Sequence, residues 1–261
     1  MIEQIQHLLK SVRLSGMAEH LQVRLQEAKA NDLPYDTFLQ NLLDDELTRR
    51  RDRLLDRRMK QAQFPYLRTI DEFDFNFNPT INKRTVKELA TTAFITRNEN
   101  VLFIGPPGVG KTHFAVAFGI EAIQNGYSVY YRSVFDMAQD LYDDPEKIMM
   151  SKYLKPHLLI LDELGMKSLP AKAAEALLEV IHRRYQQQST IIATNRPIED
   201  WGKILGDTAA TSAVLDRFLE LVNIMKITGP SYRLRNIKKG EMNIGKKEVE
   251  KESKMKSTTT F

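Results

Sequence analysis

Cysteine is absent from the 261 residues of this chain, and tryptophan occurs once. Without a thiol there is no disulfide framework, cysteine nucleophile, zinc finger or iron–sulfur centre. No apolar run approaches the roughly 20 residues that cross a bilayer. The polar opening also lacks the basic start and apolar run of a signal peptide. We therefore expect a cytoplasmic protein with no membrane partner.

Two further kinds of site are missing. The histidines show no i, i+4 pair and no glutamate partner suited to a metal: His7, His20, His113, His157 and His182. No serine lies in the nucleophile-elbow signature of serine hydrolases. The net charge of +4 is too small by itself to indicate or exclude nucleic acid.

Composition divides the chain into three zones. Residues 1–68 are rich in charge and carry apolar residues at helical spacing, which predicts a small all-α N-terminal domain. Residues 69–237 form the second predicted domain. The Lys-rich segment 238–261 has too few large apolar side chains to fold, so we expect a disordered tail.

Short apolar runs in the second domain alternate with helical stretches. Extended chain with one buried face is predicted first at 71–79, where Phe73, Phe75 and Phe77 alternate with polar residues. Beyond it, buried strands are predicted at 101–104, 128–131, 158–161, 190–193 and 222–227. Strands separated by crossover helices predict the α/β class, with a parallel five-stranded sheet flanked by helices.

The phosphate-binding pattern G-x-x-x-x-G-K-[ST] is matched in full by Gly105, Pro106, Pro107, Gly108, Val109, Gly110, Lys111 and Thr112. It follows a predicted strand and opens a helical run at His113, which is the context that a P-loop requires. The glycines let backbone N–H groups surround phosphate oxygens at the positive end of a helix. Lys111 would reach the β- and γ-phosphates of ATP, and the Thr112 hydroxyl would bind Mg²⁺.

Polar side chains follow two of the later predicted strands. Asp162 and Glu163 follow the apolar run 158–161, at the strand end where an open parallel sheet binds ligands. We expect Asp162 to hold the Thr112-bound Mg²⁺ and Glu163 to polarise the attacking water. Asn195 follows the run 190–193 and would hold that water or sense the γ-phosphate; alternatively it only begins a turn before Pro197.

This order of motifs resembles that of P-loop NTPases of the AAA+/ASCE type. More narrowly, the chain resembles the IstB/DnaC-type AAA+ ATPases, which include transposition helpers of insertion sequences and loaders of the replicative helicase. The segments that carry the resemblance are 105–113, 189–197, Trp201, 215–217 and 229–235. Two N-terminal segments, 14–18 and 33–35, resemble the transposition helpers in particular.

The resemblance implies further roles. Arg217 would be an arginine finger that reaches the nucleotide of a neighbouring subunit, so that ATP promotes a ring or spiral homo-oligomer. Arg233 or Arg235 would be the sensor-2-type arginine, and the choice between them stays open. Few residues follow the last predicted strand, so we expect the helical lid of AAA+ proteins to be reduced or absent.

A basic stretch lies near the end of the predicted N-terminal domain. Positions 49–60 carry seven basic and two acidic residues, the basic ones being Arg49, Arg50, Arg51, Arg53, Arg57, Arg58 and Lys60. Such a helix can neutralise DNA phosphates. It can equally be a solvated face with i, i+4 pairs such as Glu46–Arg50, and the sequence leaves both readings open.

The resemblance implies an ATP-dependent DNA-binding regulator of transposition with ATPase activity. It would assemble on target duplex DNA, remodel it, and recruit or stimulate a partner transposase. The alternative is a replicative helicase loader that acts on single-stranded DNA.

Overall fold

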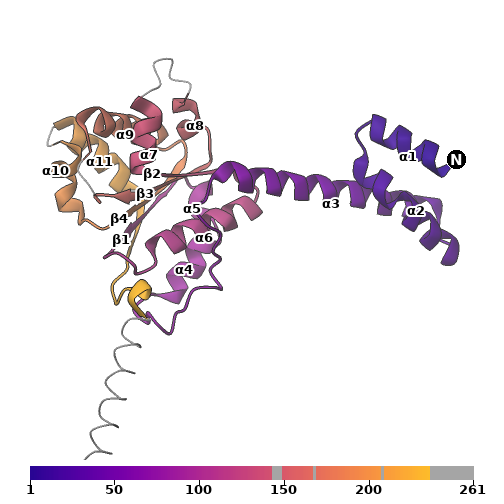
Figure 1. Ribbon diagram of the computed structural model, residues 1–261, viewed down its shortest axis with the longest axis horizontal. Coiled ribbons are helices and arrows are strands. Elements are labelled where there is room, and N and C mark those ends of the chain that lie inside the picture. The colour runs from indigo at the N-terminus through magenta and orange to yellow at the C-terminus, as the bar shows by residue number, and fades with distance from the viewer. Residues whose placement is uncertain (143–148, 167–168, 207–208, 236–261) are drawn as a thin grey trace, which may run out of the picture. The chain divides into compact units, whose positions relative to one another are not determined.

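Two compact units make up the chain in the computed structural model, Met1–Gln61 and the residues from Ala62 onward. The structure describes residues 1–142, 149–166, 169–206 and 209–235 (Figure 1). The tail expected at 238–261 lies outside the described residues. The division comes earlier than the boundary expected at 68, because the segment after Gln61 clusters with the second unit.

The first unit consists of three helices: α1 (Ile2–Ser11), α2 (Ser15–Ala30) and α3 (Tyr35–Ala62). Its small core contains Met17, Leu21 and Leu42. Gly16 lets α2 approach α3, since a Cβ there would lie 2.8 Å from the Cα of Glu46. The carboxylate of Glu46 is buried and accepts a 2.6 Å hydrogen bond from the Gly16 N–H. The predicted helical N-terminal region is confirmed.

The second unit is built on a parallel five-stranded sheet, as predicted. Its strands are β1 (Asn100–Ile104), β2 (Val129–Ser133), β3 (Leu158–Leu164), β4 (Ser189–Thr194) and β5 (Val222–Lys226). They lie in the order β2-β3-β4-β1-β5. Because β4 is inserted between β1 and β3, the ends of these three strands meet at one edge of the sheet.

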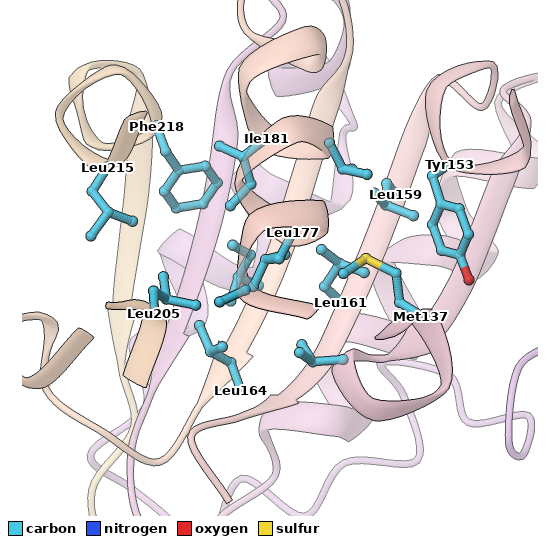
Figure 2. Close-up of a cluster of buried hydrophobic side chains, with 14 of the residues drawn as sticks. Met137, Tyr153, Leu159, Leu161, Leu164, Leu177, Ile181, Leu205, Leu215 and Phe218 are labelled. Atoms are coloured by element: carbon cyan, nitrogen blue, oxygen red, sulfur yellow. The ribbon is translucent and has the colours of Figure 1, made fainter. Parts of the chain in front are cut away.

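Helices cover both faces of the sheet (Figure 1). On one face lies α6 (Lys111–Gln124), near α4 (Lys83–Ala90) and α5 (Ala93–Thr96). On the other lie α7 (Val134–Tyr142), α8 (Met150–Leu154), α9 (Ala171–Arg184), η1 (Ile198–Asp200), α10 (Trp201–Leu205) and α11 (Ala209–Glu220). Figure 2 shows the core of this second face, where Leu161 of β3, Leu177 of α9 and Phe218 of α11 converge. Such close packing gives the strand ends a rigid base.

The phenylalanine segment at 71–79 is not extended chain, and that prediction is wrong. It forms successive turns, in which the Asp74 side chain accepts hydrogen bonds from the N–H groups of Asn76 and Phe77, both at 3.1 Å. The alternation of burial is nevertheless present, since Phe73 and Phe77 are half-buried while Asp74 is exposed. Asp74 favours turns because its short carboxylate bonds to the nearby backbone.

After β5 the described residues contain only one short helix, η2 (Tyr232–Leu234). This agrees with the expected reduced lid as far as Arg235, where the described residues end. No helix of the described part of the chain is long and apolar enough to cross a membrane.

Candidate functional site

The predicted P-loop connects β1 to α6. Gly110 immediately precedes α6 with φ +111°, and a Cβ there would lie 2.6 Å from the ring of Phe73. A Cβ at Gly105 would collide with the carbonyl oxygen of Ile227. Both positions therefore require glycine, and the loop presents the free N–H groups of the first turn of α6 to an anion.

The ammonium group of Lys111 lies within this loop. It donates hydrogen bonds to the carbonyl oxygens of Gly105, at 2.7 Å, and Pro106, at 2.8 Å. Burial lowers the pKa of Lys111; the charge of Asp162 opposes that shift and that of Arg233 adds to it. The loop thus holds a cation beside the helix N-terminus, which favours a phosphate ligand.

Asp162, near the end of β3, is buried and lies at the centre of a hydrogen-bond network. Its Oδ2 accepts from the Thr112 hydroxyl at 2.6 Å and from the Tyr131 hydroxyl at 2.9 Å. Its Oδ1 accepts from the Glu163 N–H at 2.7 Å. The structure therefore brings Thr112 and Asp162 together, as their predicted role requires. No motif pointed to Tyr131.

The oxygens of Thr112 and Asp162 suit magnesium. A hydroxyl and a carboxylate are hard oxygen ligands, and Mg²⁺ is typically held by one or two such groups together with substrate phosphates. Within the described ranges no group of three or more histidines and carboxylates could hold a metal by itself. The donor set thus fits a magnesium ion shared with a nucleotide rather than a site made wholly of protein ligands.

Glu163 adopts an unusual backbone conformation. Its φ is +65°, and the register between β3 and β4 shifts between Leu161 and Leu164. Few residues other than glycine adopt this region, and such strain gathers at functional sites. The side chain is exposed. Burial raises the pKa of its carboxyl, and the charges of Asp162 and Asp136 raise it further, as suits a group that accepts a proton.

Asn195 follows β4, between the P-loop strand and the acidic strand. Its Oδ1 is buried and has no hydrogen-bond partner. The ends of β4 and β3 are joined by the Thr194 hydroxyl, which donates to the Leu164 carbonyl at 2.8 Å. An unpaired buried acceptor costs free energy unless a ligand or water satisfies it.

A cavity of about 170 Å³ adjoins the P-loop. Its walls come from the loop, from the segment before α4 and from the chain after β5: Tyr66, Glu72, Phe73, Asp74, Phe77, Asn78, Gly108, Val109, Gly110, Lys111, Thr112, His113, Tyr232 and Arg233. His113 is fixed there by the Thr69 carbonyl, 2.7 Å from its Nε2. Sequence reasoning missed the aromatic wall, although the alternating phenylalanines were its signal.

The two C-terminal arginines make different contacts. Arg233 lines the cavity, whereas the guanidinium group of Arg235 lies 3.7 Å from the centre of the Tyr232 ring. The N–H of Tyr232 donates to the Gly108 carbonyl at 2.9 Å and so joins this segment to the P-loop. Of the two, Arg233 is the one that lines the cavity.

Arg217, near the end of α11, is absent from the residues that line the cavity. Its Nη1 lies 2.9 Å from Nδ1 of His182 on α9, and its side chain is exposed. Arg217 thus lies at the surface of the sheet unit, apart from the cavity lining.

The basic residues of α3 divide into two groups. Arg49 forms an ion pair with Glu19, Arg50 pairs with Glu46 at 2.7 Å, and Arg53 donates to the Ser15 hydroxyl at 2.9 Å. The Glu46–Arg50 pair was predicted. Arg49 and Arg53 thus link α3 to α2, and Arg50 also donates to the Arg13 carbonyl at 3.3 Å. Arg51, Arg57 and Lys60 are exposed and Arg58 is half-buried.

Comparison with known proteins identifies the family. The family model of the IstB-like ATP-binding protein matches residues 7–240. The ATP-binding protein of insertion sequence IS5376 from Geobacillus stearothermophilus is 37% identical over 239 residues, covering 90% of this chain and 95% of that relative. Its counterpart from IS21 of Pseudomonas aeruginosa is 34% identical over 242 residues, covering 91% of each chain.

Among solved structures, DnaI is similar with a TM-score of 0.51 and 19% identity, over 63% of this chain and 89% of that one. This likeness shows the fold alone. The family match carries the assignment, and it agrees with the P-loop and acidic strand end described above. The chain belongs to the family of IstB-like ATP-binding proteins.

Proposed function

We propose that this protein is an ATP-hydrolysing regulator of DNA transposition, which assembles on target duplex DNA, remodels it and recruits or stimulates a partner transposase. The observation that carries the proposal is the meeting of Lys111, Thr112, Asp162 and Glu163 at one sheet edge, in a chain whose relatives are named as ATP-binding proteins of insertion sequences.

ATP is the substrate that the site fits. The phosphates belong at the P-loop N–H groups and Lys111, and the base belongs against the aromatic cavity wall that Phe73 and Tyr232 contribute. Thr112 and Asp162 would hold Mg²⁺, which when bound neutralises charge on the phosphate oxygens. Arg233 adds a second cation at the cavity.

Glu163 is the group that takes the proton from the attacking water, while Asn195 holds that water. Both lie at the ends of neighbouring strands, and the unpaired Asn195 oxygen supports its assignment as an acceptor for a water molecule. General-base catalysis of this kind contributes roughly 10²- to 10⁴-fold to rate.

Hydrolysis depends on a second subunit in this proposal. Arg217 does not line the cavity of its own chain. It would supply positive charge that stabilises the transition state in the nucleotide site of the neighbouring subunit. The test is the ATPase rate per subunit on dilution to a demonstrated monomer. We expect it to fall, and a constant rate would contradict the role of Arg217 between subunits.

The helical unit is the proposed contact with DNA and transposase. Arg51, Arg57 and Lys60 are exposed cations, and Leu39, Leu43 and Leu47 form an exposed apolar stripe along α3. The transposase would supply the strand-transfer chemistry, because the proposed catalytic groups here all belong to ATP hydrolysis.

Electron microscopy with duplex DNA and ATP tests the function as a whole. We expect ordered assemblies on the duplex with ATP and their loss when ATP is replaced by ADP. Assemblies on single-stranded DNA alone, together with binding to a helicase ring, would overturn transposition in favour of helicase loading. A transposase gene directly upstream would be consistent with the first outcome.

A further inference from the structure

Tyr131 is a buried tyrosine whose hydroxyl reaches the P-loop side of the acidic strand. It lies on β2, the edge strand beside β3, and pairs in register with Ile160. From there its hydroxyl donates to Oδ2 of Asp162 at 2.9 Å. The same oxygen accepts the 2.6 Å hydrogen bond from Thr112, so two donors from different elements converge on one carboxylate oxygen.

We propose that Tyr131 is a positioning residue for the magnesium site, holding the Asp162 carboxylate in the orientation that faces Thr112. This inference rests on the proposed use of Mg²⁺–ATP. The Glu163 N–H restrains Oδ1, and Tyr131 restrains Oδ2, so the carboxylate plane is defined at both oxygens before any ligand arrives. Hydrogen bonds to ligating carboxylates commonly set the affinity of a metal site in this way.

The aromatic ring of Tyr131 is itself held in place. Phe64 packs edge-on against it, with ring centroids 6.4 Å apart and planes at 62°. The Phe64 ring in turn occupies the space above Gly119 of α6, where a Cβ would lie 2.7 Å from the ring. Phe64 thus supports the Tyr131 ring on one side while the hydroxyl donates to Asp162. A phenylalanine at 131 would keep this packing and remove only the hydrogen bond.

The variant Tyr131→Phe tests the role, and Tyr153→Phe is its matched control. Tyr153 is fully buried and donates a 2.5 Å hydrogen bond to Asp140, away from the P-loop. We would measure binding of a fluorescent ATP analogue in a Mg²⁺ titration and again in EDTA. For Tyr131→Phe we expect the half-saturating Mg²⁺ concentration to rise by about 10- to 100-fold, with unchanged affinity in EDTA. Tyr153→Phe should match the wild type in both arms.

A Mg²⁺ dependence of Tyr131→Phe equal to that of the wild type would overturn the inference, as would an equal loss in EDTA. If that variant fails to fold, Phe64→Leu replaces it, with a smaller rise in the same direction expected and no rise counting against the role. If the wild-type protein binds no nucleotide, the proposed function itself is wrong. If the wild type binds nucleotide but Tyr131→Phe behaves like it, only the role of Tyr131 is wrong.

Discussion

The two units of the chain differ in what holds them together. In the second unit, apolar strands are buried between layers of helices, and Leu102, Ile160 and Ile192 are fully buried. In the first unit the buried core cluster consists of Met17, Leu21 and Leu42, while several large apolar side chains remain exposed, such as Leu47, which is 64% exposed. The nucleotide site therefore stands on a large apolar core, whereas the helical unit depends heavily on polar contacts.

Those polar contacts are specific. Arg24 forms two 2.8 Å hydrogen bonds with Asp45, and Glu46 receives the first free N–H groups of α2. Small units bury little surface and are only marginally stable. Loss of a single interaction should therefore destabilise the helical unit. In the sheet unit, by contrast, a side chain of the nucleotide site can be replaced without loss of the fold.

The largest effect is expected from substitution of Glu163, which should change ATP turnover without changing the fold. Glu163→Gln should reduce ATP turnover by about 10²- to 10⁴-fold, because the amide cannot accept the proton from water. Its exposed side chain is not part of the core, so nucleotide binding should persist. Phosphate release and binding of a fluorescent ATP analogue measure the two properties. Turnover at the wild-type rate would remove Glu163 from its assigned role.

Next in size is a pair of core truncations, one in each unit. Leu177→Ala and Leu42→Ala should each cost about 2–5 kcal/mol through lost burial and the cavity left behind. In the sheet unit this should lower the thermal midpoint of an otherwise intact fold. In the helical unit it should unfold the helices while nucleotide binding survives. Circular dichroism with nucleotide titration distinguishes these results, and concerted unfolding of both units by Leu42→Ala would contradict the comparison.

Acid should affect the helical unit through Glu46 and Asp45. Burial alone would raise the pKa of Glu46, but hydrogen bonds from Arg50 and from the N–H groups of Gly16 and Met17 hold it below its ordinary value of 4.5. The hydrogen bond from Arg24 lowers the pKa of Asp45. A lowered folded-state pKa gives stability that is present above the ordinary value and is lost as pH falls through the lowered one.

Helix content followed by circular dichroism below pH 4.5 should therefore fall as these carboxylates take up protons. Glu46→Ala should cost about 1–3 kcal/mol at neutral pH, because it leaves the buried N–H groups of α2 unsatisfied. It should also remove part of the acid sensitivity. An unchanged acid transition in that variant would assign the sensitivity to other groups.

The smallest effect is expected on the exposed cations of α3. Arg51→Ala and Arg57→Ala should leave stability unchanged and each lower the slope of log affinity against log salt for duplex DNA by about 1. Arg50→Ala is the contrasting variant, because its guanidinium group pairs with Glu46. It should weaken the helical unit itself. If the slope of log affinity against log salt is the same for the wild type and Arg51→Ala, Arg51 does not contact DNA.

The sequence predicted the strands themselves, because apolar runs such as 158–161 must lie buried between two layers of helices. It did not predict the order of the strands in the sheet. The P-loop was predictable because its glycines and Lys111 are required locally, by backbone conformation and charge. The turns at Phe73–Phe77 were mistaken for extended chain because burial alternates in both, and only the hydrogen bonds of Asp74 distinguish them.

By itself the sequence determined what local chemistry demands: the α/β class, the phosphate loop, the acidic strand end and a separate helical N-terminal region. Only the tertiary structure decided which distant residues meet. It brought Tyr131 to Asp162, placed Arg233 at the cavity while Arg235 packs on Tyr232, and joined Arg49 and Arg53 of α3 to α2. The reason is physical, since backbone preference acts between neighbours in the chain, whereas such contacts depend on how whole elements pack.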